Sequence, residues 1–483
     1  MRRVAEKSMA FTVRFGSRLR IASVCCAILL APGLSGCVLD SEQPRLDIEM
    51  PTSYRTAPRA ADAAVPTLDW WRGFRSKELT SLIESAQAWN LDIAVAFAQI
   101  IQADAQVGIA GAPLLPSLTG TASAEQARTP GATGKTFSQF STGLTASYML
   151  DFWGKNRSAL NAAEETAIAA RYNRDVVTLT AIVTVANTYF QVVAAQDRLR
   201  IAREDLASAQ RILGLVKTQF NGGTVTQLEL SQQEALVSTQ RASIPPLEIT
   251  LRQNIAALAV LVARAAPNFN VHGGGLAQIA IPKVTPGLPS DLLYQRPDIR
   301  LAEAQLASSN FSVESARAAF FPQIQLTGQT GFQSAALSTL FGPGAWYYTL
   351  MAGVTQPIFD GHLLESQLKQ AKGLQLQYLQ AYRKAVLSAF ADVEKALIAL
   401  QQSTLQERLQ ADVVANSRRA FNVSETQLRG GSVNLITVLQ TQQALFTAQD
   451  TLAQVRLTKL LAATSLFQAL GGGWSPEKFA ALH

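Results

Sequence analysis

Cysteine and histidine are the side chains best suited to nucleophilic, redox and metal chemistry, and this sequence has few of either. The three cysteines are Cys25, Cys26 and Cys37, and the three histidines are His272, His362 and His483. The histidines are widely separated and have no metal-ligand spacing. Beyond residue 37 there is no thiol, which excludes disulfides, cysteine-based metal sites and cysteine catalysis there. We therefore expect no cofactor, no metal and no enzymatic activity.

Cys37 is the one reactive residue whose surroundings indicate a specific modification. Six Lys and Arg residues precede an apolar run, residues 21–30, that is too short to span a bilayer. The run leads to Leu34-Ser35-Gly36-Cys37, a lipobox pattern in which small residues give a peptidase access and the thiol receives lipid. The sequence predicts a signal peptide over residues 1–36 and lipidation of Cys37. The alternative is a chance cysteine in an ordinary signal peptide. Val38 and Leu39 follow, with no Asp at the second position, which favours the outer membrane over the inner one.

Removal of this leader changes the charge of the protein. The leader has six basic residues and one Glu, so it carries +5 of the formal net charge of +7, and the mature chain is left near +2. Nucleic-acid binding thereby loses its only support, and no nucleic acid is expected as a partner. The mature chain contains no run of 18 apolar residues and hence no predicted transmembrane helix. An outer-membrane protein of this kind is either lipid-tethered or a β-barrel.

The mature chain contains an internal duplication. Four short segments recur in the same order, about 206 to 209 residues apart. The pairs are residues 114–118 with 320–324, 152–154 with 359–361, 221–225 with 429–433, and 233–236 with 442–445. Four matches in register indicate two structural repeats. We assign residues 37–76 to an N-terminal lipid-anchored segment, 77–280 to the first repeat, 281–473 to the second repeat and 474–483 to a C-terminal tail.

Each repeat begins with a short amphipathic helix and two alternating segments. The helices are expected near Lys77–Val107 and Asp298–Ala319. The segments alternate weakly apolar residues with Ser, Thr and Gln, as between Leu118 and Ala124 and between Trp346 and Val354. Period-two alternation predicts strands. Such strands fit a barrel wall between lipid and water, and equally a soluble two-faced sheet. The loops at residues 129–131 and 342–344 would be external.

A long helical hairpin follows each pair of strands. Lys155–Leu213 and Leu374–Arg429 lack Gly and Pro, and a helix of roughly 60 residues reaches about 90 Å. Gly-Gly pairs at residues 222–223 and 430–431 end these helices. The returning helices are expected from Thr226 to about Ala266, with an interruption at Pro245-Pro246, and from Val433 to Leu470. Each hairpin resembles an antiparallel coiled coil.

Four membrane strands cannot form a closed barrel by themselves. Open strand edges would leave backbone donors and acceptors unpaired in hydrocarbon. If the strands span the membrane, several chains must share one barrel. Three copies would supply twelve strands and twelve long helices, but this argument does not select three over other numbers.

Residues at the start of the second repeat carry a family resemblance. The segment Leu292–Arg300, with Ala302-Glu303 and then residues 318–322, resembles the lipoprotein branch, of NodT type, of the TolC-like outer-membrane efflux proteins. The resemblance extends from Trp70-Trp71 to Gly473. It implies an α+β membrane protein: a homotrimeric duct with a shared 12-stranded β-barrel, a long α-helical barrel and two internal repeats. The implied partners are a periplasmic adaptor, an inner-membrane transporter of the resistance-nodulation-division class, and outer-membrane lipid. Drugs or other small toxic compounds would pass along the bore without chemical change.

The resemblance also implies positions for the functional sites. The adaptor-facing tips would be the turns Asn221-Gly222-Gly223-Thr224 and Arg429-Gly430-Gly431-Ser432. The gate positions, where close relatives often have an apolar residue, an Asp and an Arg, correspond to Ile436, Gln440 and Gln443. Both charges are replaced by Gln, so we expect closure through Ile436 and neutral amides rather than an ion pair. Arg296, Pro297 and Asp298 are expected to have a structural role at a helix start. The alternative function is a lipid-anchored periplasmic coiled-coil scaffold or adaptor without a pore.

Overall fold

The computed structural model describes residues 51, 54–55, 66–130, 134–284, 289 and 292–474. Within them the chain forms two compact units, a sheet unit of residues 116–155 and 314–360 and a helical unit of the remainder. The predicted signal peptide, Cys37, His483 and most of the segment 37–76 lie outside the described residues.

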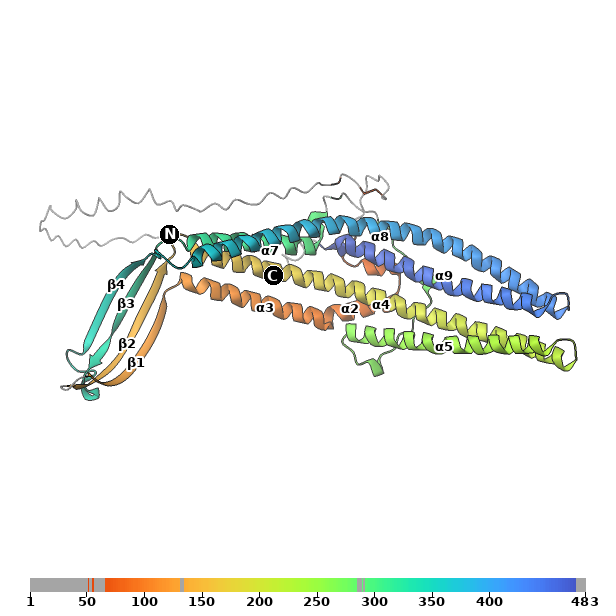
Figure 1. The fold of residues 1–483 in the computed structure, drawn as a ribbon, viewed down its shortest axis with the longest axis horizontal. Coiled ribbons are helices and arrows are strands. Elements are labelled where there is room, and N and C mark those ends of the chain that lie inside the picture. The colour runs from red at the N-terminus through yellow and green to blue at the C-terminus, as the bar shows by residue number, and fades with distance from the viewer. Residues whose placement is uncertain are drawn as a thin grey trace, which may run out of the picture. The chain divides into compact units, whose positions relative to one another are not determined.

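The sheet unit contains four antiparallel strands, as the alternating segments predicted. They are β1 (Ser117–Arg128), β2 (Thr136–Leu150), β3 (Gln323–Ser334) and β4 (Trp346–Thr355), paired in the order β1-β2-β3-β4 (Figure 1). Each repeat therefore supplies one hairpin, and the two hairpins join through β2 and β3. The outer edges of β1 and β4 have no strand partner within the described part of the chain.

The helical unit begins with two helices where the sequence analysis predicted one. They are α2 (Lys77–Trp89) and α3 (Leu91–Gly111), separated by Asn90. The Asn90 backbone is extended, and its side-chain oxygen accepts hydrogen bonds from the amides of Asp92 and Ile93. Asn is among the best N-cap residues because it satisfies the free amides of a first helical turn. The prediction of a single helix was wrong for this reason.

The first long hairpin consists of α4 (Lys155–Asn221) and α5 (Gln227–Leu261). Helix α4 continues through Gly214 and ends at the turn that the Gly-Gly pair predicted. Helix α5 is unbroken across Pro245 and Pro246, so the predicted interruption is wrong. The hydroxyl of Ser243 donates to the carbonyl of Gln240, and that of Thr250 donates to the carbonyl of Pro246, so side chains hydrogen-bond to the helix on both sides of the prolines.

The second repeat has the same organisation. The short α6 (Leu292–Gln295) precedes α7 (Pro297–Ala318), and the second hairpin consists of α8 (Leu363–Arg429) and α9 (Leu435–Ala469). Helix α8 starts well before the predicted Leu374. The prediction counted only a segment without Gly and so began after Gly373, whereas the helix includes that residue. Figure 1 shows that both hairpins reverse at the same end of the helical unit.

An aromatic cluster forms the main core of the helical unit. Trp70, in a short 3-10 helix (Trp70–Phe74), stacks on Phe467 of α9 at 4.7 Å between ring centroids. Phe74 is fully buried against Phe190 of α4, at 5.1 Å. The residues before α2 are thus fixed by contacts with both hairpins, through offset and edge-on ring contacts that add to the burial of apolar area.

Two helical segments among the described residues are long and apolar enough to cross a membrane, by length and composition only. They are Lys77–Leu114 and α4. More than half of the apolar window of α4 is buried within the protein, as in a core helix, whereas only 11% of the window in Lys77–Leu114 is buried. Both segments contain polar residues and therefore lack an uninterrupted run of 18 apolar residues.

Candidate functional site

The strand register places every row of the sheet on one of two chemically distinct faces. Leu118 pairs with Ala146, which pairs with Gly328, which pairs with Leu350. The adjacent row, on the other face, is Thr119, Thr145, Gln329 and Thr349. Because side chains alternate along a strand, the four strands together form one weakly apolar face and one Ser/Thr/Gln face.

The polar face is connected by side-chain hydrogen bonds. Ser123 and Ser141 hydroxyls lie 2.8 Å apart, and the amide of Gln325 donates to the hydroxyl of Ser147 at 2.9 Å. Gly143 and Gly331 also pair on this face. A Cβ added to Gly331 would lie 2.3 Å from the carbonyl oxygen of Thr142, so β2 and β3 approach too closely there for any other residue.

The two predicted tips have the same backbone structure. In the first, Gly223 has φ +73°, and the amide of Thr224 donates to the carbonyl of Gln219 at 3.0 Å. In the second, Gly431 has φ +72°, and the amide of Ser432 donates to the carbonyl of Gln427 at 2.9 Å. In addition, the amide of Gly223 donates to the carbonyl of Phe220, and the amide of Gly431 donates to the carbonyl of Leu428. Each turn is therefore a Schellman motif, which satisfies the last carbonyls of the helix.

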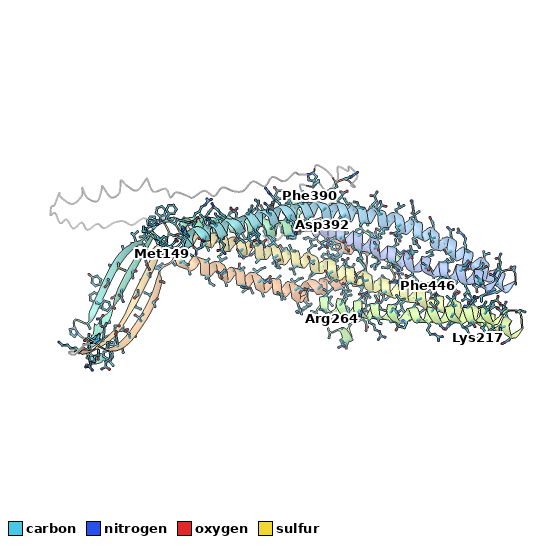
Figure 2. All side chains as sticks on the ribbon, in the orientation of Figure 1. Met149, Lys217, Arg264, Phe390, Asp392 and Phe446 are labelled. Carbon is cyan, nitrogen blue, oxygen red and sulfur yellow. The ribbon has the colours of Figure 1, made fainter. Side chains whose placement is uncertain are left out.

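The residues after each tip begin the returning helix. Thr226 and Glu229 form a capping box, with the Thr226 amide 2.7 Å from the Glu229 carboxylate. Asn434 caps α9 by accepting from the amide of Thr437 at 3.1 Å. Lys217, labelled near the tips in Figure 2, forms an ion pair with Glu234 across the first hairpin, at 3.4 Å. Each reversal is therefore fixed by local hydrogen bonds.

The predicted gate positions lie on one exposed stripe of α9. Ile436 is 46% exposed, and Gln440 and Gln443 are exposed four and seven residues later. The amide of Gln443 lies 3.4 Å from the hydroxyl of Thr447, which continues the stripe. The stripe thus begins with one apolar side chain and continues with uncharged polar ones.

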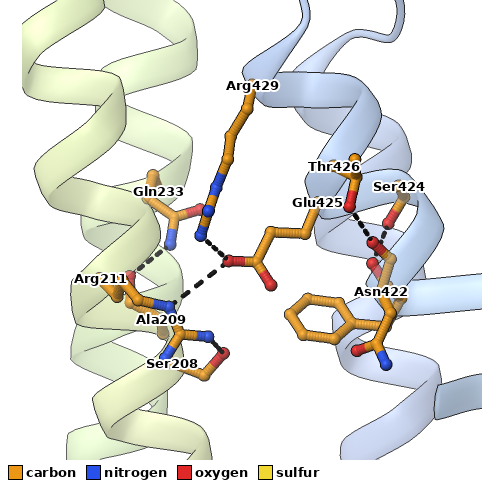
Figure 3. A network of polar contacts seen from close by, with 10 residues as sticks. Ser208, Ala209, Arg211, Gln233, Asn422, Ser424, Glu425, Thr426 and Arg429 are labelled. Atoms are coloured by element: carbon orange, nitrogen blue, oxygen red, sulfur yellow. Dashed lines mark hydrogen bonds and ion pairs between the residues drawn. The ribbon is translucent and has the colours of Figure 1, made fainter.

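An ionic cluster that the sequence analysis missed joins the two hairpins near the tips. Figure 3 shows Arg211 of α4 and Arg429 of α8 converging on Glu425 of α8. The Arg429 guanidinium lies 2.7 Å from the Glu425 carboxylate, and that of Arg211 lies 3.4 Å from it. The pair within α8 has i, i+4 spacing and could have been found from sequence. The contact from Arg211 joins residues far apart in the chain and could not.

Arg296 connects the start of the second repeat to the second hairpin. Its guanidinium binds both carboxylate oxygens of Asp298, at 3.0 and 2.7 Å, and donates to the carbonyl of Ala469 at 3.2 Å. Asp392 of α8 lies 3.4 Å away. Burial by itself would lower the pKa of Arg296, but the Asp298 and Asp392 carboxylates outweigh this effect. The net pKa is therefore raised, and the guanidinium stays charged. Pro297 occupies the first position of α7, where its missing amide costs nothing.

The described residues contain no group of three or more His, Cys, Asp and Glu side chains that could hold a metal ion. His272 and His362 are exposed, each beside a glutamate, Glu78 and Glu365. The features that remain are two-faced strands, long helical hairpins and a neutral stripe near their tips.

The fold is similar to that of the Campylobacter jejuni CmeC outer membrane channel, with a TM-score of 0.84, 24% identity, and coverage of 92% of this chain and 98% of that one. The model of the outer membrane efflux protein family matches residues 82–264 and 288–472, and the chain belongs to this family.

Relatives of known name agree with this assignment. The chain is 37% identical over 462 residues to the pyoverdine export outer membrane protein OpmQ of Pseudomonas putida, covering 94% of this chain and 98% of that protein. It is 30% identical to the probable outer membrane lipoprotein SilC of Salmonella typhimurium, over 95% and 99% of the two chains. The protein is an outer-membrane channel component of an efflux pump, and its family consists of transport components rather than enzymes.

Proposed function

We propose that three copies of this chain form one duct, with a shared β-barrel in the outer membrane and a helical tube in the periplasm. The observation that carries this proposal is the two-faced sheet with open edges at β1 and β4. In hydrocarbon each unpaired backbone group costs several kcal/mol, so the edges must pair with those of other copies. The number three comes from the family resemblance.

Aromatic side chains support a membrane-spanning role for the sheet. Trp153 stacks on Phe321 at 4.8 Å at one end of the strands. At the other end, Phe332 pairs across strands with Trp346. Phe321 and Phe332 are separated by about 37 Å along an extended chain. A strand tilted by about 40° would bring that to about 28 Å, close to the apolar band between the aromatic girdles of membrane barrels.

Exposed apolar stripes on the helices support assembly. On α8, Leu376, Leu387, Ile398 and Leu409 are all exposed and are evenly spaced along the helix. Their spacing is that of a hendecad repeat, which keeps the stripe on one side of a helix that is nearly straight or follows a slight right-handed supercoil, as lateral packing in a tube requires. The exposed apolar window of Lys77–Leu114 would be covered in the same way.

The stripe at Ile436, Gln440 and Gln443 is the proposed periplasmic gate. Three Ile436 side chains would narrow the bore, and Gln440 and Gln443 would close it through amide hydrogen bonds. Exposed ion pairs contribute only about 0 to 1 kcal/mol each, so their replacement by Gln is compatible with closure. The tips at residues 221–224 and 429–432 would contact a periplasmic adaptor, which links the duct to an inner-membrane transporter of the resistance-nodulation-division class.

Cys37 is the proposed lipid anchor, supported by its lipobox and by the relative SilC, whose name describes a probable outer membrane lipoprotein. Metabolic labelling with a fatty acid should label the wild-type protein and leave Cys37→Ser unlabelled. Labelling of the variant would refute the assignment.

Electron microscopy of the detergent-extracted mature protein tests the duct directly. We expect three-fold particles with a helical portion on the order of 100 Å long. Monomers or thin rods without a ring would refute the shared barrel and favour the poreless scaffold. Planar-bilayer recording provides a second test, because a scaffold would give no conductance.

A further inference from the structure

A glutamine lies in the apolar seam between α8 and α9. On α9 the buried residues of this seam are spaced three and four apart and are Leu435, Val438, Gln442 and Leu445. They belong to a buried region that includes Phe421 of α8. This spacing places side chains against the partner helix of a coiled coil. Three of the four α9 residues are apolar, and only Gln442, which is 3% exposed, brings an amide into the seam.

The amide of Gln442 has no hydrogen-bond partner among the residues that the structure describes, for either its nitrogen or its oxygen. The hydroxyl of Ser424 on α8 is engaged elsewhere, because it lies 2.7 Å from the hydroxyl of Thr441 and 2.9 Å from the carbonyl of Phe421. The chain itself encloses the amide, so a second copy cannot reach it unless α8 or α9 moves. An unpartnered buried amide raises the free energy of the arrangement that contains it.

The seam of the first hairpin contains a buried glutamine that does have a partner. Gln233 of α5 is fully buried, and Figure 3 shows its side chain directed at α4. Its amide nitrogen donates to the main-chain carbonyl of Ala209 at 2.8 Å, while its oxygen has no partner among the described residues. A helix carbonyl can accept this second bond because it has two lone pairs. The two hairpins therefore differ, since Gln233 bonds α5 to α4 and Gln442 makes no such bond from α9 to α8.

Gln442 is next to the proposed gate in the sequence and on the opposite face of the helix. Gln440 and Gln443 are exposed on the same turn of α9. Because main-chain hydrogen bonds hold a helical turn together, its buried and exposed faces move together. Any rotation or shift of α9 that brings the amide of Gln442 to a carbonyl of α8 therefore displaces Gln440 and Gln443 as well.

We infer that Gln442 is a positioning residue for the gate. Its unpartnered amide destabilises the described arrangement of α8 and α9. Helix α9 therefore passes readily to a second arrangement, in which the amide donates to a main-chain carbonyl of α8, as Gln233 does to Ala209. The gate positions move with it. This inference rests on the proposed duct and its gate, and it identifies the residue that makes the gate movable.

Gln442→Met tests this role, because methionine is close to glutamine in length and has no amide. It should fill the seam without leaving a polar group unpartnered, and it should thereby hold the gate in the described arrangement. In planar bilayers in potassium chloride, the variant should switch between conductance levels about five-fold less often than the wild type, the factor expected for removing one unpartnered buried group. In detergent, its thermal unfolding midpoint should rise by roughly 2 °C.

Gln233→Met is the matched control, at a buried glutamine in the seam of the other hairpin. This change removes the hydrogen bond to Ala209 together with the unpartnered oxygen, so the unfolding midpoint should not exceed that of the wild type. Switching should not become slower, because the proposed gate positions are on α9.

The outcomes separate this inference from the proposed function. A purely structural role for Gln442 would lower the unfolding midpoint of Gln442→Met or leave switching unchanged, and either result refutes the inference. A bound water that satisfies the amide would also give a lower midpoint, because methionine would displace it. If the wild type conducts and the variant switches at the wild-type rate, the duct stands and the role of Gln442 is refuted. If the wild type gives no conductance, the duct and its gate are refuted together with this inference.

Discussion

Asp205 of α4 allows a pH-dependent prediction to be worked from the structure. The side chain is only 8% exposed, and one of its carboxylate oxygens is buried without a hydrogen-bond partner among the residues that the structure describes. Burial raises the pKa of Asp205 to about 7, the charge of Glu204 contributes in the same direction, and Arg418 opposes the shift. We expect Asp205→Asn to stabilise the protein above pH 7 and to have little effect near pH 4.

The sign and the size of this stability difference follow from the pKa of Asp205 in the unfolded and in the folded state. An unfolded Asp has a pKa of about 3.9. Below that value both states are protonated and folding is not penalised. Between about pH 4 and 7 the unfolded state ionises first, so stability falls as pH rises. Above the folded pKa the loss of unfolding free energy is complete. The folded and unfolded pKa values differ by about three, which corresponds to a loss of at most about 4 kcal/mol per chain.

Thermal unfolding of the helical signal in detergent, from pH 4.5 to 8.5, measures this effect. The midpoint difference between Asp205→Asn and wild type should grow with pH and level off above about pH 7. Asp412→Asn, at an exposed position on α8, is the control and should change the midpoint little. A constant difference for Asp205→Asn, or a variant less stable than wild type at pH 8, would show that the carboxylate has a partner and refute the reasoning.

Three further predictions concern positions fixed by local geometry. Arg296→Met should lower the free energy of unfolding by about 2 to 3 kcal/mol, because charge-assisted hydrogen bonds to two carboxylates and a carbonyl are lost. Denaturant titration measures this change, and an unchanged midpoint would contradict the structural role of Arg296. Gly331→Ala should abolish heat-resistant oligomers on gels because its Cβ meets backbone at 2.3 Å, whereas Gly353→Ala, with open space around it, should not. Gly431→Ala, at φ +72°, should destabilise the second hairpin by about 1 kcal/mol, and Gly430→Ala, at φ −83°, should do so less; equal midpoints for the two variants would show that the turn tolerates a side chain.

The strands and the tips could be predicted from sequence because their signals are local. Period-two alternation alone fixes which residues share a face, and the register from Leu118 to Leu350 follows it. A Gly-Gly pair after a long Gly-poor segment indicates a reversal, and both reversals occur there.

The errors came from residues whose effect depends on context. Asn90 carries a recognisable capping signal, but the helical pattern on both sides obscured it. Pro245 and Pro246 normally disrupt a helix, yet α5 continues through them. The contact of Glu425 with Arg211 and the electrostatic effect of Arg418 on Asp205 join residues of different repeats, and no local pattern encodes such pairs.

The unbroken passage of α5 through Pro245 and Pro246 has a mechanical consequence. Neither proline has an amide hydrogen, so the carbonyls of Arg241 and Ala242 cannot receive the bonds that stiffen an ordinary helix. Helix α9 contains no proline. The two hairpins of one chain have the same turn structure but differ in bending rigidity. Under an equal lateral load the first hairpin would flex at its prolines, while the second would transmit the load along its length.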